Sequence, residues 1–196
     1  MAGIDYEVPT WSQIYDMLLS QAQKISTQNF RADIIVGLAR GGLIPARILT
    51  DLLETPELAT IQISFYQNIA QPTLEPILKQ ALTVPIEGKK VLLVDDIADT
   101  GESLKLAQIH LNQQEAREIK TATLYLKPQS ITTPDFYEKR TSAWVVFPWD
   151  TKETLRKIIQ HRLGKRVLTQ EVSKLVKAGL PKLLAEKLLK DMQKEA

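Results

Sequence analysis

Residues 91–103 have the sequence VLLVDDIADTGES, and this stretch decides the expected fold. Its first four residues are apolar, which is typical of a strand buried on both faces of a sheet. Carboxylates follow at once, and Gly101 opens a helix that is expected to continue to about Asn112. In open parallel sheets, ligands bind at the carboxyl ends of the strands. The polar residues after this strand therefore predict a binding site.

The same stretch offers groups that suit a phosphorylated ligand. The free N–H groups and the positive dipole end of a helix N-terminus favour a phosphate, and Thr100 and Ser103 add hydroxyl donors. The carboxylates of Asp95 and Asp96 are suited to hold diol hydroxyls or Mg²⁺. One aspartate alone is more often a helix cap. Three carboxylates at one strand end repel each other, however, and a cap needs only one.

Outward from this stretch, strands alternate with helices. Strands are expected at residues 33–38, 59–64, 90–94, 119–126 and 143–147. A capping box at Thr10 and Gln13 predicts the start of a helix. Residues 66–86 contain three prolines and have weak periodicity, so a long loop is expected there. The alternation predicts an α/β fold with a doubly wound, mostly parallel sheet.

Composition excludes several classes of site. The 196 residues include no cysteine, which excludes a disulfide framework, thiolate zinc sites and cysteine nucleophiles. Two histidines exclude a multi-histidine metal site. No stretch approaches the length of an apolar membrane span, and the first ten residues lack an apolar signal core. A cytoplasmic protein without a membrane partner is therefore expected.

Charge divides the chain into two parts. Residues 1–150 hold 13 Lys and Arg against 18 Asp and Glu, a net charge of −5, whereas residues 151–196 hold 12 against 5, a net charge of +7. The second part predicts helices at residues 152–162, 169–177 and 181–194. We therefore expect one domain over residues 1–150 and a basic helical C-terminal extension over residues 151–196.

Three stretches together resemble a known family. Residues 91–103 resemble the phosphoribosyl pyrophosphate (PRPP) signature of type I phosphoribosyltransferases: an apolar strand, paired acids, a third acid three residues on, then Thr-Gly. Residues 39–45, ARGGLIP, resemble the pyrophosphate loop, which in relatives often contains a non-proline cis peptide. The segments YLKP at 125–128, PDFY at 134–137 and WVVFPWD at 144–150 resemble the purine pocket of the xanthine-guanine and archaeal 6-oxopurine branch. The resemblance covers about residues 8–150 and implies the type I phosphoribosyltransferase fold with a small hood.

The resemblance implies a purine phosphoribosyltransferase. Such an enzyme transfers the 5-phosphoribosyl group of PRPP to N9 of a 6-oxopurine (hypoxanthine, guanine or xanthine) in purine salvage, and releases pyrophosphate. Asp99 is implied as the group that exchanges a proton with the base, and Asp95 and Asp96 as ligands of Mg²⁺. A homodimer is also implied. The implied PRPP-binding residues are Arg40, Gly41, Asp95, Asp96, Asp99, Thr100, Gly101, Glu102 and Ser103.

Four residues are implied in purine binding. Lys127 aligns with a lysine that donates to the exocyclic oxygen at purine C6, and an ammonium group, which only donates, suits a 6-oxo group better than a 6-amino group. Trp144 is expected to stack on the purine plane, although a core tryptophan is as common. Val145 is expected to offer backbone groups to the base edge. Asp150 either accepts a hydrogen bond from a 2-amino group or caps the following helix.

A lid is expected because water would intercept a reactive ribosyl cation. Ser64 and Tyr66 match a Ser-Tyr feature of the lids of relatives. Relatives often carry a cation early in this segment, whereas here Lys79 is the only Lys or Arg between Ser64 and Gly88.

Two alternatives remain open. An adenine phosphoribosyltransferase on the same scaffold would need only a small shift of Lys127. A PRPP-sensing regulator that binds nucleic acid is suggested by the basic extension. The extension has no aromatic residue for base stacking, however, and its leucines predict an apolar packing face instead.

Overall fold

The computed structural model describes residues 4–67, 74–161 and 165–194. They belong to two compact units. The sheet unit is Tyr15–Thr141, and the terminal unit combines Met1–Ile14 with Ser142–Ala196. The terminal unit includes residues on both sides of position 150. The expected boundary at residue 150 between a catalytic domain and an extension stays a prediction.

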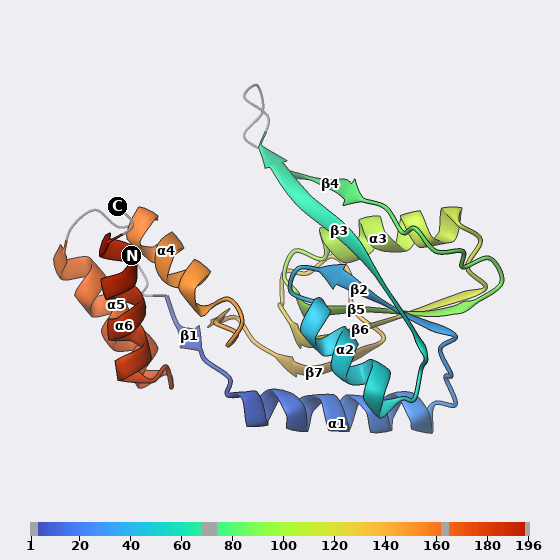
Figure 1. The fold of residues 1–196 in the computed structure, drawn as a ribbon, viewed down its shortest axis with the longest axis horizontal. Coiled ribbons are helices and arrows are strands. Elements are labelled where there is room, and N and C mark those ends of the chain that lie inside the picture. The colour runs from blue at the N-terminus through green and yellow to red at the C-terminus, as the bar shows by residue number, and fades with distance from the viewer. Residues whose placement is uncertain (1–3, 68–73, 162–164, 195–196) are drawn as a thin grey trace. The chain divides into compact units, whose positions relative to one another are not determined.

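The sheet unit is built on a six-stranded sheet with the order β4-β3-β2-β5-β6-β7 (Figure 1). All neighbouring strands are parallel except β3 and β4, so the sheet is mostly parallel, as predicted. The central strands are buried on both faces, which their continuous apolar runs require. The strands are β2 (Ile34–Ala39), β3 (Glu57–Gln67), β4 (Leu74–Gln80), β5 (Lys90–Ala98), β6 (Glu118–Leu126) and β7 (Phe136–Arg140).

Helices cover both faces of this sheet. Helix α3 (Glu102–Gln113) buries Leu104, Ala107 and Leu111 in one core with alternate residues of β2 and β5. Helix α2 (Leu43–Leu52) packs on the other face, where a Cβ at Gly37 would lie 3.0 Å from that of Ala46. Helix α1 (Trp11–Thr27) lies on the same side as α2 (Figure 1). Its capping box forms as predicted: the Thr10 N–H donates to Gln13 Oε1 at 2.8 Å, and the Gln13 N–H donates to Thr10 Oγ1 at 3.2 Å.

The expected long loop at residues 66–86 is wrong in part, because β3 continues to Gln67 and β4 occupies residues 74–80, where it pairs antiparallel with β3. Residues 81–86 form a loop, and residues 68–73 lie outside the described residues. The prolines of this stretch misled the prediction. Pro76 is tolerated because β4 is an edge strand, where a missing N–H breaks no ladder on the outer side. The ladder continues beyond Gln62, the last β3 residue paired with β2, so the two strands extend past the sheet as a hairpin (Figure 1).

The expected strand at residues 143–147 takes a different place from the one predicted. The edge strand of the main sheet is instead β7, which was not predicted because its sequence, FYEKR, is mostly polar. Only Trp144–Val145 is a strand, β8, and it pairs in parallel with β1 (Tyr6–Glu7) in a separate sheet of the terminal unit.

The terminal unit has its own apolar core. Its helices are α4 (Thr151–His161), α5 (Lys165–Lys177) and α6 (Lys182–Lys194), which confirms the helical extension predicted from sequence. The Tyr6 hydroxyl donates to Glu171 Oε2 at 2.7 Å and ties β1 to α5. The buried core residues are Val146, Leu155, Ile158, Leu175, Leu180, Ala185 and Met192. Among the described residues, no helix is both long enough and apolar enough to cross a membrane.

Candidate active site

The predicted phosphate-binding segments meet at one edge of the sheet, where β2 and β5 are neighbours. From β2 the chain passes through α2 to β3 on one side, and from β5 it passes through α3 to β6 on the other. This reversal is the topological switch point at which open α/β sheets bind ligands. Residues 40–42 and 99–101 follow the two strands and therefore both begin there.

The glycine loop after β2 lies directly against the end of β5. A Cβ on Gly41 would collide with the carboxylate of Asp96, and one on Gly42 would lie 2.9 Å from Asp95 Cα and closer still to the Val94 carbonyl oxygen. The peptide bond between Ala39 and Arg40 is cis, as the resemblance implied. Two segments more than fifty residues apart thus form one surface, and only glycine fits there.

The paired carboxylates at the end of β5 are crowded. Asp96 is only 9% exposed, and its N–H donates to Asp95 Oδ1 at 2.9 Å. Burial raises the pKa of Asp95 well above its ordinary value, and the charge of Asp96 raises it further. Hydrogen bonds that the Asp95 carboxylate accepts from the backbone N–H groups of Asp96 and Gly42 oppose this shift but do not cancel it. A bound cation or a pair of hydroxyl donors would relieve the repulsion between the two carboxylates.

The residues after β5 form an anion-binding turn. Gly101 has φ +81° and is the N-cap of α3, which has no side-chain cap hydrogen bond. The cap interpretation of the aspartates therefore does not hold for this helix. The Glu102 N–H, the first of α3, makes only a long 3.4 Å hydrogen bond to Thr100 Oγ1. A helix N-terminus of this kind suits an anion, and Thr100 is exposed and Ser103 half-buried beside it.

Lys127 follows β6, the next strand of the sheet. The residue is only 7% exposed, and its backbone N–H donates to the Ala98 carbonyl at 2.9 Å. The structure therefore brings Lys127 to the segment that carries Asp99. It also adds a residue that sequence reasoning missed: Gln129 Nε2 donates to Asp99 Oδ1 at 2.7 Å. Nothing in the local sequence distinguishes Gln129 from an ordinary surface glutamine.

The predicted lid residues lie on the β3–β4 hairpin. Ser64 is in β3 and pairs with Ile77, and the backbone of Tyr66 pairs with that of Glu75. Lys79 is exposed and is the extra residue of a β-bulge, because Gln62 pairs with Gln80 while Ile63 pairs with Leu78.

The other predicted purine-binding residues belong to the terminal unit. Trp144 is half-buried, with its ring 6.5 Å from that of Tyr6, and it packs against the core of that unit. Val145 is 5% exposed. Asp150 directly precedes α4, and its carbonyl accepts the Thr154 N–H at 2.9 Å, which places it at the cap position.

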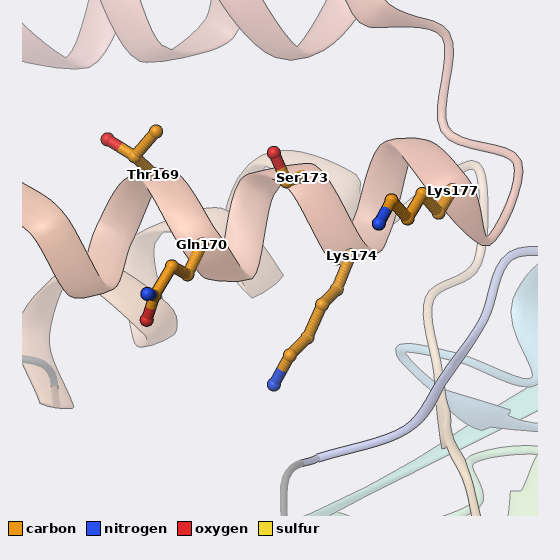
Figure 2. Close-up of a pocket in the computed structure, with 5 residues that line it drawn as sticks. All are labelled: Thr169, Gln170, Ser173, Lys174 and Lys177. Atoms are coloured by element: carbon orange, nitrogen blue, oxygen red, sulfur yellow. The ribbon is translucent and has the colours of Figure 1, made fainter.

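An open hollow of about 470 Å³ lies along α5 and contains none of the predicted site residues (Figure 2). Thr169 and Ser173 point to one side of the helix, and Gln170 and Lys174 point to another (Figure 2). Lys174 is held by Glu171 at 3.0 Å. Lys177 completes the lining, which includes no aromatic residue on which a base could stack.

The fold and the site together define an α/β protein whose switch point carries groups suited to a phosphorylated ligand. The sequence model of one protein family, the phosphoribosyl transferase domain, matches residues 10–154 of this chain. The chain belongs to this family, in its purine branch, and is therefore a pentosyltransferase enzyme.

Individual relatives agree with this assignment. A xanthine-guanine phosphoribosyltransferase of Nitratidesulfovibrio vulgaris (strain Hildenborough) is 36% identical over 120 residues, which are 60% of this chain and 69% of the relative. One from Cereibacter sphaeroides is 30% identical over 146 residues, covering 72% and 84%. The solved structure of a purine phosphoribosyltransferase from Pyrococcus horikoshii has a TM-score of 0.68 at 35% identity, and the match covers 74% of this chain and 94% of that one.

Proposed function

We propose that this enzyme transfers the 5-phosphoribosyl group of PRPP to N9 of a 6-oxopurine and releases pyrophosphate. One observation supports this most: the glycine loop of Gly41 and Gly42 lies against Asp95 and Asp96, beside the N-terminus of α3. Backbone donors, a diol-binding carboxylate pair and an anion-binding helix end are the three groups that PRPP needs. The named relatives act on xanthine and guanine, or on purines.

The residues take the following parts. Arg40 and Gly41 hold pyrophosphate, residues 99–103 hold the 5-phosphate, and Asp95 and Asp96 hold the ribose hydroxyls. N9 of the base forms a bond to ribose C1 while the C1–O bond to pyrophosphate breaks, and the electron pair leaves with pyrophosphate. Asp99 accepts the proton that N7 releases as the base becomes neutral.

A magnesium ion fits the donor set at the end of β5. Mg²⁺ prefers oxygen ligands and usually takes one or two carboxylates together with substrate phosphates. The described residues contain no cluster of three or more candidate ligands, so Asp95 and Asp96 would hold the ion together with PRPP. When bound, Mg²⁺ neutralises charge on the leaving pyrophosphate.

Lys127 sets the preference for the base in this proposal, through donation to the exocyclic oxygen at C6. Trp144, Val145 and Asp150 complete purine recognition according to the family resemblance, and the hairpin with Ser64, Tyr66 and Lys79 is the lid. We further propose that the enzyme is a cytoplasmic homodimer, with a catalytic domain over residues 1–150 and an extension over residues 151–196.

The test is pyrophosphate release from PRPP and Mg²⁺ with hypoxanthine, guanine, xanthine and adenine in separate reactions. Turnover with the 6-oxopurines and little with adenine supports the proposal. Turnover with adenine alone overturns the role of Lys127. No turnover with any base overturns the proposed reaction, and salt-dependent binding of nucleic acid would then favour the regulator.

A further inference from the structure

The segment after β6 is tied to the phosphate-binding turn by backbone hydrogen bonds. The Lys127 N–H donates to the Ala98 carbonyl at 2.9 Å, and the Ile131 N–H donates to the Thr100 carbonyl at 2.8 Å. The Thr132 hydroxyl donates to the Gly101 carbonyl at 3.1 Å. We call residues 127–132 the strap, because these three hydrogen bonds tie them to residues 98, 100 and 101.

Hydrogen bonds within the strap also hold its own turn. The Ser130 N–H donates to the Lys127 carbonyl at 3.1 Å, which closes a turn, and the Ser130 hydroxyl donates to the Thr132 carbonyl at 2.8 Å. A Cβ on Gly101 would lie 2.5 Å from Ser130 Oγ and 2.7 Å from the Thr132 nitrogen, so strap and turn are in close contact.

Gln129 is the strap residue that reaches Asp99. Its Nε2 donates to Asp99 Oδ1 at 2.7 Å, and both side chains are exposed. The amide can face a carboxylate only through its NH₂ group, because its oxygen would be repelled. The bond engages one carboxylate oxygen and favours the side-chain conformations of Asp99 that keep it, so Oδ2 is the oxygen left for the substrate.

We propose that Gln129 is a positioning residue, which orients the Asp99 carboxylate to accept the proton from the purine. The inference rests on the proposed function, because it gives Gln129 a part in that reaction. Lys127 lies on the same strap, so one segment sets both the group that recognises the base and the orientation of the group that deprotonates it. Misplacing a reacting group costs rate more than substrate affinity.

Steady-state kinetics of Gln129→Met and Gln129→Glu test the proposal. Methionine keeps the length but removes the donor, and kcat should fall by about tenfold while KM for PRPP stays within about twofold. Glutamate keeps the shape of the side chain but repels the Asp99 carboxylate, so the kcat of the Gln129→Glu enzyme should fall further. The matched control is Gln113→Met, an exposed residue at the far end of α3, which should keep the wild-type kcat.

A double-mutant cycle shows whether Gln129 acts through Asp99. In an Asp99→Asn background, Gln129→Met should cause no further loss, whereas independent effects would multiply. A second readout needs no turnover: the NMR resonance of the Gln129 side-chain amide should shift on Asp99→Ala and stay unchanged in Gln113→Met.

The outcomes separate the two proposals. Wild-type kcat in Gln129→Met, with Asp99→Asn impaired, overturns the positioning role and leaves the proposed reaction standing. An amide resonance indifferent to Asp99→Ala overturns the contact itself. A wild-type chain that turns over no purine overturns both proposals.

Discussion

Gly41→Ala should separate catalysis from folding. The added methyl would lie 2.5 Å from Asp96 Oδ1 and closer still to Oδ2, whereas ordinary contacts begin at 3.4 Å, so the carboxylate must move by more than about 0.9 Å. Asp96 is 9% exposed and has little free space to move into. A displacement of about 1 Å in a group that positions substrate can cost about 100-fold in rate, which corresponds to about 2.7 kcal/mol of transition-state stabilisation.

The assay is kcat/KM for PRPP at a saturating purine concentration, together with urea unfolding. The matched control is Gly88→Ala, at the opposite end of β5, where φ is +69° and no atom lies within 4 Å of the new Cβ. That variant should lose about 1 to 2 kcal/mol of unfolding free energy through its backbone conformation and keep its turnover. A Gly41→Ala enzyme with wild-type kcat/KM would refute the argument that the loop must lie against Asp96.

Three further substitutions, at Gly101, Lys127 and Asp135, test other parts of the sheet unit. Gly101→Ala should raise KM for PRPP in steady-state assays, because its methyl collides with the Thr132 backbone and its φ is +81°; an unchanged KM would contradict this. Lys127→Ala should reduce kcat/KM for hypoxanthine and guanine more than for adenine, and an equal loss would count against its role as donor. Asp135→Asn tests a pKa: burial raises the pKa of Asp135, but hydrogen bonds from Lys120 at 2.9 Å and the Thr121 N–H at 2.8 Å outweigh burial and lower it. The stabilisation is therefore present above an unfolded-state pKa of about 4 and is lost as the pH falls through the lower folded-state pKa. Urea unfolding should show a loss of about 1 kcal/mol at neutral pH and a shallower decline in acid, and an unchanged decline would be inconsistent with this.

The local sequence pattern predicted the central strand and the helix that follows it, because their apolar residues have the spacing of a buried strand and of a helix with one buried face. The apolar run before Asp95 predicted the central strand β5, and the helix expected from Gly101 to Asn112 is α3, Glu102–Gln113. Pattern failed at both edges of the sheet, in β4 and β7. An edge strand is paired on one side only, so it tolerates Pro76 and the polar sequence of β7 and carries no clear alternation.

The sequence by itself determined the chemistry: which residues carry carboxylates, glycines and hydroxyls, and in what local order along one strand, one turn and one helix start. The local order of residues is enough to predict this segment, because the strand, the turn and the helix start are consecutive in the chain. Only the tertiary structure decided which of these groups meet. The strand order places β2 beside β5 and β5 beside β6, and this brings Gly41 against Asp96 and Gln129 onto Asp99. Such contacts depend on strand register and on side-chain reach across a sheet edge, and residues that are separated by 30 or more positions acquire them only when the whole sheet has formed.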